Sequence, residues 1–185
     1  MIGNWKLTRR KFIRLTALGV GALSLAPGCG PESRPQRKFL ADDEASLLGS
    51  IADQIIPPDE WPGGREGGVV SFLDTQLIGA YARFQKDYRR GLAAITETCA
   101  TRYHSRFESL PGDRQTAFLK EMESGALRDG PWKDGFSARL FNLLRSHSLQ
   151  GYYGSPRHGG NPGFVSYRMI GLDYPQIVGQ NRERS

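Results

Sequence analysis

The sequence predicts an all-α fold, organised as a single small helical domain with long loops. Apolar residues recur at three- and four-residue steps in several runs, which is the spacing of one helix face. Strict alternation of apolar and polar residues, the pattern of a half-buried strand, is almost absent. Setting aside an N-terminal signal of 28 residues leaves about 157 of the 185 residues, enough for one ordinary domain.

Residues 1–28 have the pattern of a removable export signal. Residues 6–14 hold five cations and no acid, and an uncharged apolar run of eleven residues follows. That run is shorter than the roughly 20 residues of a membrane-spanning helix. Arg9, Arg10 and Phe12 resemble the twin-arginine motif, which implies export of a folded protein through the twin-arginine translocase. The alternative is an ordinary secretory signal that contains paired arginines.

Two kinds of processing fit the end of this signal. Ala26 and Gly28 are small residues at the −3 and −1 positions before Cys29, as signal cleavage requires. A lipoprotein peptidase would cut the same bond if Cys29 were lipidated, although the usual Leu at −3 is replaced here by Ala26. Lipidation would tether the chain to a membrane face without spanning it.

Most of the net positive charge belongs to the signal. Removing its five cations from the formal net charge of +6 leaves +1. No basic stripe with interleaved aromatic residues remains, so no nucleic-acid partner is expected. Residues 29–41 form a polar, proline-containing linker, and residues 179–185 form a polar tail.

The structured domain is expected from residue 42 to residue 178. Asp42 or Asp43 can cap the first helix, which Pro57 and Pro58 end because proline disfavours helical geometry in the preceding residue. After a glycine-rich loop at 57–68, a helical run begins near Val69. Its apolar stripe continues at helical spacing and predicts one long amphipathic helix, with this stripe: Phe84, Tyr88, Leu92, Ile95, Cys99, Tyr103 and Phe107.

Two further helices complete the predicted fold. Leu110-Pro111-Gly112 breaks the long helix, and Asp113 can cap the next one. A loop at 125–135 precedes a last strong helix that contains His147. The sequence GYYGSPRHGGN at 151–161, called the glycine loop below, is expected to end that helix with Gly151 as its C-cap.

The sequence contains no evident catalytic or metal-binding constellation, so no cofactor is expected on this chain. None of the histidines lies four residues from another, and no cluster of Cys or carboxylates completes a metal site. His104 is expected at the surface and His147 in the core. Cys99 lies on the apolar stripe, which predicts either a buried thiol or a disulfide to another chain.

The glycine loop has the composition of a protein contact surface. Tyr and Arg are enriched in interfaces, and glycines permit unusual backbone shapes that present them. A phosphate cradle is disfavoured, because a helix precedes this loop instead of following it. The alternative is a loop that folds back on its own core. The predicted partner-binding residues are Tyr152, Tyr153, Gly159, Gly160 and Asn161.

The chain resembles the gluconate 2-dehydrogenase subunit 3 family over about residues 42–178. The resemblance rests on the twin-arginine start, on the Asp-x-Ile-Ile-Pro sequence at 53–57, on Gly-Val-x-x-Phe-Leu-Asp at 68–74 and above all on the glycine loop. Residues 169–172 before Tyr174-Pro175 fit the segment that follows the loop in that family. One departure is Tyr167, where the family often has a Trp.

The resemblance implies a non-catalytic small subunit of a periplasmic FAD-dependent dehydrogenase of the glucose-methanol-choline type. The large subunit would hold FAD and the sugar or polyol substrate, and a multihaem cytochrome c often accepts the electrons. The small subunit would escort its partner through twin-arginine export and support its maturation. It would associate with the membrane through the complex or through lipidated Cys29. The alternative is a stand-alone periplasmic small-molecule-binding protein or enzyme that uses His147, Arg157 and His158 around the glycine loop.

Overall fold

The computed structural model describes residues 37–172, and within them it is entirely helical, which confirms the predicted fold class. The export signal with Arg9, Arg10 and Phe12, and the processing site at Cys29, lie outside the described residues. The α-helices are α2 (Asp42–Ile55), α3 (Val69–Gln76), α4 (Gln85–Tyr103), α5 (Gly112–Glu123), α6 (Phe136–Tyr153) and α7 (Val165–Met169). Short 3₁₀ turns join them: η1 (Ala82–Phe84), η2 (Phe107–Ser109), η3 (Gly130–Trp132), η4 (Pro156–His158) and η5 (Pro162–Phe164).

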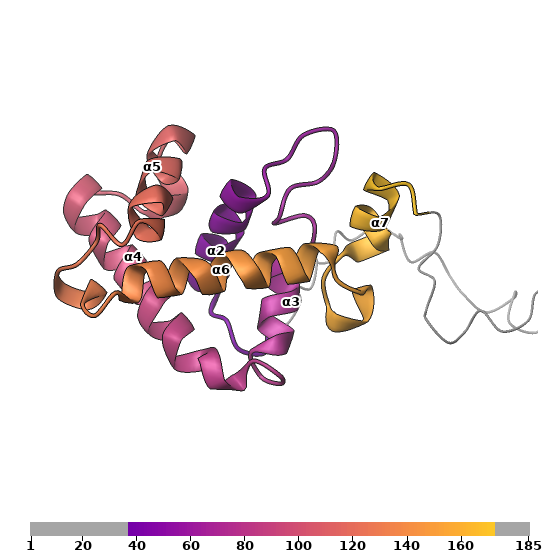
Figure 1. Ribbon diagram of the computed structural model, residues 1–185, viewed down its shortest axis with the longest axis horizontal. Helices are drawn as coiled ribbons and strands as arrows, with labels where there is room; N and C mark the ends of the chain where they lie inside the picture. The colour runs from indigo at the N-terminus through magenta and orange to yellow at the C-terminus, as the bar shows by residue number, and fades with distance from the viewer. Residues whose placement is uncertain (1–36, 173–185) are drawn as a thin grey trace, which may run out of the picture. The chain divides into compact units, whose positions relative to one another are not determined.

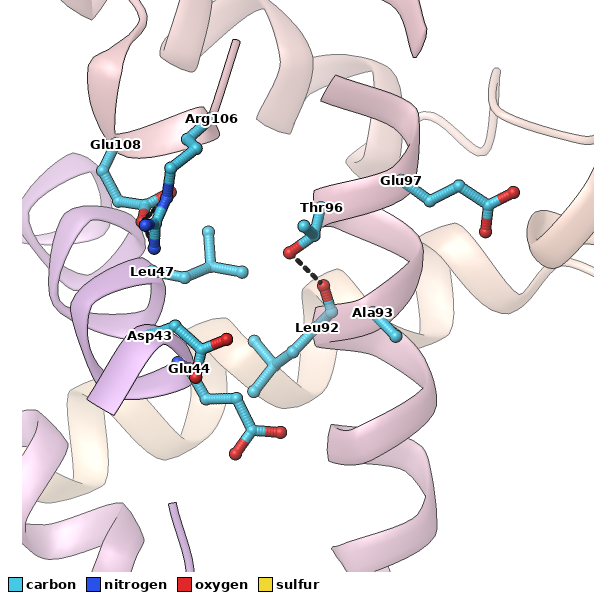
Figure 2. A pocket seen from close by; sticks show the side chains of 9 residues that line it. All are labelled: Asp43, Glu44, Leu47, Leu92, Ala93, Thr96, Glu97, Arg106 and Glu108. Atoms are coloured by element: carbon cyan, nitrogen blue, oxygen red, sulfur yellow. Dashed lines mark hydrogen bonds and ion pairs between the residues drawn. The ribbon is translucent and has the colours of Figure 1, made fainter. Parts of the chain in front are cut away.

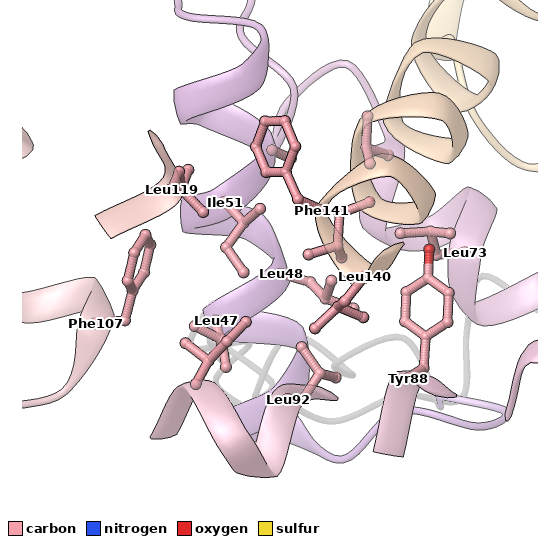
Figure 3. Packing of buried hydrophobic residues seen from close by; sticks show 14 of the residues in the cluster. Leu47, Leu48, Ile51, Leu73, Tyr88, Leu92, Phe107, Leu119, Leu140 and Phe141 are labelled. Atoms are coloured by element: carbon pink, nitrogen blue, oxygen red, sulfur yellow. The ribbon is translucent and has the colours of Figure 1, made fainter. Parts of the chain in front are cut away.

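Helix α6 is the central element of the domain, since it contacts α2, α3, α4, α5 and α7 (Figure 1). Its buried stripe meets apolar residues from the surrounding helices in one continuous core (Figure 3). The largest fully buried side chains of this core are Leu48, Ile51, Leu73, Leu77, Tyr88, Leu92, Ile95, Phe107, Phe118, Met122, Phe136 and Tyr152. Burying each such side chain contributes roughly 1.5–3 kcal/mol before conformational entropy is subtracted.

The first helix ends before Pro57 as predicted, but neither Asp42 nor Asp43 is its N-cap. The N-cap is Ala41, and the side chain of Glu44 accepts a hydrogen bond from the Ala41 N–H at 2.9 Å. All three acidic residues lie in the first turn, where negative charge interacts favourably with the helix dipole. The acidic residues therefore stabilise the helix start through their charge and through the hydrogen bond that Glu44 accepts from Ala41. Asp42 and Asp43 lie in the first turn of the helix instead of at its N-cap.

The long helix predicted from Val69 to Phe107 is divided into α3 and α4, so that prediction is wrong in detail. Hydrogen bonds from the N–H groups of Gly79 and Tyr81 to the carbonyl of Gln76 turn the chain after α3. Helix α4 ends at Tyr103, where His104 takes a left-handed conformation with φ 51°. The apolar spacing continues across these breaks because the turns on either side of α4 also pack against the core.

The last two predicted helix boundaries also shift. Pro111, not Asp113, is the N-cap of α5, and Asp113 lies in its first turn. Helix α6 continues through Gly151 to Tyr153, with Gly154 as its C-cap, so Gly151 is not the C-cap. A Cβ atom on Gly151 would lie 2.9 Å from the ring of Phe72. This glycine therefore permits close packing of α6 on α3, a requirement that local sequence does not reveal.

Candidate functional site

The glycine loop packs against the loop at 57–68 instead of standing free in solvent. The ring of Tyr152 is almost fully buried, and its hydroxyl donates a hydrogen bond to the carbonyl of Pro62 at 2.7 Å. A Cβ atom on Gly67 would lie 2.3 Å from that ring. The Asn161 N–H donates to the carbonyl of Gly67 at 3.0 Å. Two glycine-rich loops that are distant in sequence thus form one closely packed unit.

Asn161 joins three parts of this unit. It is fully buried in a left-handed conformation with φ 48°. Its side-chain amide donates to the Gly154 carbonyl, and its side-chain oxygen accepts from the Ser166 N–H, each at 2.9 Å. Asn161 therefore connects the end of α6 and the start of α7 to the loop at 57–68, where its backbone N–H donates to Gly67.

The predicted partner-binding residues separate into two groups. Tyr152, Gly160 and Asn161 are buried, and Gly159 holds a positive φ of 95°, so these four form the internal frame of the loop. Any effect they have on a partner acts through the backbone shape. Tyr153 is 43% exposed and can contact a partner directly.

Most of the large exposed hydrophobic residues come from one stretch of the chain, the C-terminal end of α6 and the η4, η5 and α7 segments that follow it (Figure 1). We define the apolar end by five of them: Leu149, Tyr153, Phe164, Ile170 and Leu172. Among the described residues, only one other large hydrophobic residue, Ile78, is comparably exposed. Of this set, only Tyr153 is among the partner-binding residues predicted above. The spacing of Leu149 and Tyr153 off the buried stripe of α6 is the signal that could have indicated the rest of that face.

Phe164 is the most unusual member of the apolar end. It is exposed and adopts a left-handed conformation with φ 58°, which is a genuine outlier for a bulky residue. Its ring stacks on Tyr167, with 6.0 Å between ring centres. Such a conformation costs on the order of 1–3 kcal/mol, and it persists only where the surroundings enforce it. The backbone of η5 thus holds an aromatic ring outward at an energetic cost.

Asp74, the last residue of the Gly-Val-x-x-Phe-Leu-Asp sequence, fastens residues 38–40, which we name the N-terminal arm. Its carboxylate accepts hydrogen bonds from the backbone N–H groups of Lys38, Phe39 and Leu40 at 2.8, 2.9 and 2.8 Å. Burial acts to raise the pKa of Asp74, but the three N–H donors outweigh it and lower the pKa below its usual value. This role of Asp74 is not apparent from the sequence alone.

His147 is the core histidine predicted from the stripe of α6. It is 5% exposed, its ring stacks on Tyr81 at 4.2 Å, and its Nδ1 lies 3.0 Å from the Tyr88 hydroxyl. Burial lowers the pKa of His147 to about 4, and the charge of Arg83 acts in the same direction. His158, in contrast, is exposed. The enclosure of His147 leaves it closed to a substrate.

Stability should fall as the pH falls from about 6.5 to 4. The folded chain holds His147 neutral, whereas the unfolded chain gains a proton near its ordinary pKa of about 6.5. The stabilisation is fully present above that value and declines as the pH falls through the folded pKa, by up to about 3 kcal/mol. Urea unfolding between pH 7.5 and 4 measures it, with His147→Gln as the variant that lacks this titration. An unchanged pH dependence in His147→Gln would assign the loss to other groups.

Of the two states predicted for Cys99, a buried thiol and a disulfide to another chain, the structure shows the buried thiol. It is fully buried in α4, and burial raises its thiol pKa to about 11, with Glu108 acting in the same direction and Arg102 against it. A thiol of this kind is unreactive. A disulfide to another chain would require Cys99 to leave the core.

A cavity of about 560 Å³ lies between α2, α4 and η2 (Figure 2). Its lining combines apolar side chains with acidic ones: Asp43, Glu44, Leu47, Leu92, Ala93, Thr96, Glu97, Arg106 and Glu108. Two of the carboxylates already have partners, since Glu44 pairs with Arg89 and Glu108 pairs with Arg106. Within residues 37–172, no group of three or more His, Cys, Asp or Glu side chains is arranged to hold a metal ion. No helix in the same range is long and apolar enough to cross a membrane.

Within residues 37–172 the protein is a small all-helical domain, and five of its six large exposed hydrophobic residues lie between residues 149 and 172. A family model described as gluconate 2-dehydrogenase subunit 3 matches residues 42–173, and the chain belongs to this family. It is therefore a member of a family of dehydrogenase subunits, in agreement with the resemblance seen in the sequence. Searches of curated proteins and of solved structures gave no significant match.

Proposed function

We propose that this chain is the non-catalytic small subunit of a periplasmic FAD-dependent dehydrogenase, and that it binds the large flavoprotein subunit through the apolar end. The observation that carries the proposal is that five of the six large exposed hydrophobic residues lie in the stretch from residue 149 to residue 172, in a member of a dehydrogenase subunit family. Exposed apolar groups of this kind are typical of protein contact sites.

Phe164 and Tyr153 are the best candidates for the centre of this contact. Aromatic residues are enriched in interfaces and often dominate their binding energy. Phe164 keeps its ring outward in a strained backbone conformation. Contact with a partner would offset the free-energy cost of that strain. FAD, the sugar or polyol substrate and the chemistry would lie on the large subunit, and a multihaem cytochrome c would accept the electrons.

The interface can be tested by co-purification of the flavoprotein with Tyr153→Ala and Phe164→Ala variants. Truncation of a central aromatic residue typically costs 2 kcal/mol or more, so each variant should bind the partner about 25-fold more weakly. Circular dichroism should show an unchanged fold, because both side chains are exposed. Ile78→Ala, which removes an exposed apolar residue outside the apolar end, is the matched control. Wild-type retention of the flavoprotein by both folded aromatic variants would place the interface elsewhere.

We further propose that the chain escorts its partner through the twin-arginine translocase. Replacing Arg9 and Arg10 with Lys should then strand both the chain and the flavoprotein in the cytoplasm, because one signal would serve two folded proteins. Cell fractionation followed by dehydrogenase assay of each fraction makes the measurement. Normal export of the flavoprotein from this strain would contradict the escort role while leaving the subunit role intact.

A further inference from the structure

A second open cavity, of about 480 Å³, lies where α4 ends and α5 begins. Its lining residues come from the junction of the two helices: Arg102, Tyr103, His104, Ser105, Ser109, Leu110, Pro111 and Arg114. We name it the basic notch, because three of these side chains are basic and none is a carboxylate. The hydroxyl groups of Tyr103 and Ser109 add further hydrogen-bond donors, whereas that of Ser105 donates to the Arg106 carbonyl at 3.4 Å.

The two guanidinium groups of the notch each lie near the same aromatic ring. The Cζ atoms of Arg102 and Arg114 lie 5.6 and 6.0 Å from the ring centre of Tyr103. Arg102 is partly neutralised, since it pairs with Glu121 at 2.6 Å. Arg114 makes no ion pair with any carboxylate in residues 37–172. Of the two guanidinium groups beside this ring, only Arg102 therefore has a carboxylate partner within residues 37–172.

His104 adds a third basic group at the same place. It follows Tyr103 directly and is exposed, in a left-handed conformation with φ 51°. Glycine is the usual residue at such a helix end, because a side chain there costs roughly 1 kcal/mol. Glu108 is already paired with Arg106, and Asp113, the remaining acid near this junction, precedes Arg114 without lining the cavity.

We propose that the basic notch binds a phosphate group between Arg114, Arg102 and His104. The planar guanidinium fork matches the oxygen atoms of a phosphate, and Arg is the preferred residue for this recognition. A phosphate also has enough acceptor oxygens to use the imidazole and hydroxyl donors, which a carboxylate with two oxygens would leave partly unused. Free phosphate compounds and the headgroups of anionic lipids share this chemistry.

Titration of the full-length chain with inorganic phosphate at low ionic strength tests the site. The ring signals of His104 in an NMR spectrum should shift and saturate, whereas those of His158, exposed outside the notch, should not move. Arg114→Gln should weaken phosphate binding at least about tenfold, because one charge-assisted contact is lost. Arg139→Gln, which removes an exposed Arg on α6, is the matched control and should leave the affinity unchanged.

Sedimentation with vesicles distinguishes the two sources of the phosphate. Binding to phosphatidylglycerol vesicles that depends on Arg114, with no binding to phosphatidylcholine vesicles, would identify a lipid headgroup. Saturable binding of inorganic phosphate without vesicle binding would identify a free phosphate compound. Equal weakening in Arg114→Gln and Arg139→Gln, or unmoved His104 signals, would overturn the proposal. The titration involves this chain alone, so its failure would not affect the proposed dehydrogenase interface.

Discussion

Replacing Gly160 with Ala is expected to destabilise the domain by about 3 kcal/mol or more, or to prevent folding. A Cβ atom at this position would lie 2.1 Å from the carbonyl oxygen of Gly151. The atoms that this Cβ would meet all belong to the backbone of Gly151, so no side-chain rotation can relieve the clash, and overpacking of this kind costs more than an ordinary core substitution. Urea unfolding of the purified variant measures the loss.

Gly112→Ala provides the control for this experiment. Its Cβ atom would meet only the side-chain nitrogen of Gln54, at 3.9 Å, and the position lies at the start of α5. Ala is favoured over Gly in a helix, so this variant should be as stable as the parent or slightly more so. If Gly160→Ala unfolds at the same urea concentration as Gly112→Ala, the close approach of the glycine loop to α6 is not a feature of the folded protein.

The Asp74→Ala variant should lose roughly 3 kcal/mol and release the N-terminal arm. The substitution removes the acceptor for three backbone N–H groups, and hydrogen bonds to a charged group contribute about 1.5–3 kcal/mol each, not fully additively. Urea unfolding should report the lost stability, and the amide hydrogens of Lys38, Phe39 and Leu40 should exchange much faster with solvent.

Asp74→Asn serves as the intermediate variant, because it keeps one acceptor oxygen and removes the charge. We expect its arm amides to exchange at rates between those of the parent and of Asp74→Ala. Unchanged exchange in Asp74→Ala would mean that other contacts hold the arm. Arg89 is the obvious candidate, since it donates to the Phe39 carbonyl at 2.6 Å and lies over the Phe39 ring.

The helical fold class and the end of α2 could be predicted because each depends on local chemistry. Apolar spacing reports which side chains face the core, and Pro57 acts on its own neighbour. The break between α3 and α4 could not be predicted in this way. Leu77, Tyr81 and Phe84 keep helical spacing and still contact the core while the backbone turns beneath them. The spacing of apolar residues shows which side chains are buried. A turn that keeps the same side chains buried therefore hardly changes that spacing.

The candidate site was only partly predictable, for a related reason. The composition of the glycine loop indicated a special segment, but not which residues face inward. Gly151 resembles a helix C-cap in sequence, yet it lies within α6, and the lack of room for a side chain there comes from Phe72, about 80 positions earlier in the chain. The exposure of Phe164 depends on a left-handed conformation that only the surrounding fold imposes. Contacts between distant segments decide such features, and a single sequence does not display them.

The attachment of the arm to Asp74 determines how the domain responds to mechanical tension on its N-terminal side. Along the backbone, a pull on the chain before residue 37 reaches Lys38, Phe39 and Leu40 before it reaches α2, and the direct link from Arg37 to Asp42 is an exposed ion pair of little strength. One carboxylate on α3 shares that tension among three hydrogen bonds, and Arg89 adds a fourth contact. The first event under force would therefore be detachment of the arm from α3, which spares the first turn of α2 from fraying. Asp74 thus carries tension applied to the preceding chain before that tension can unwind α2.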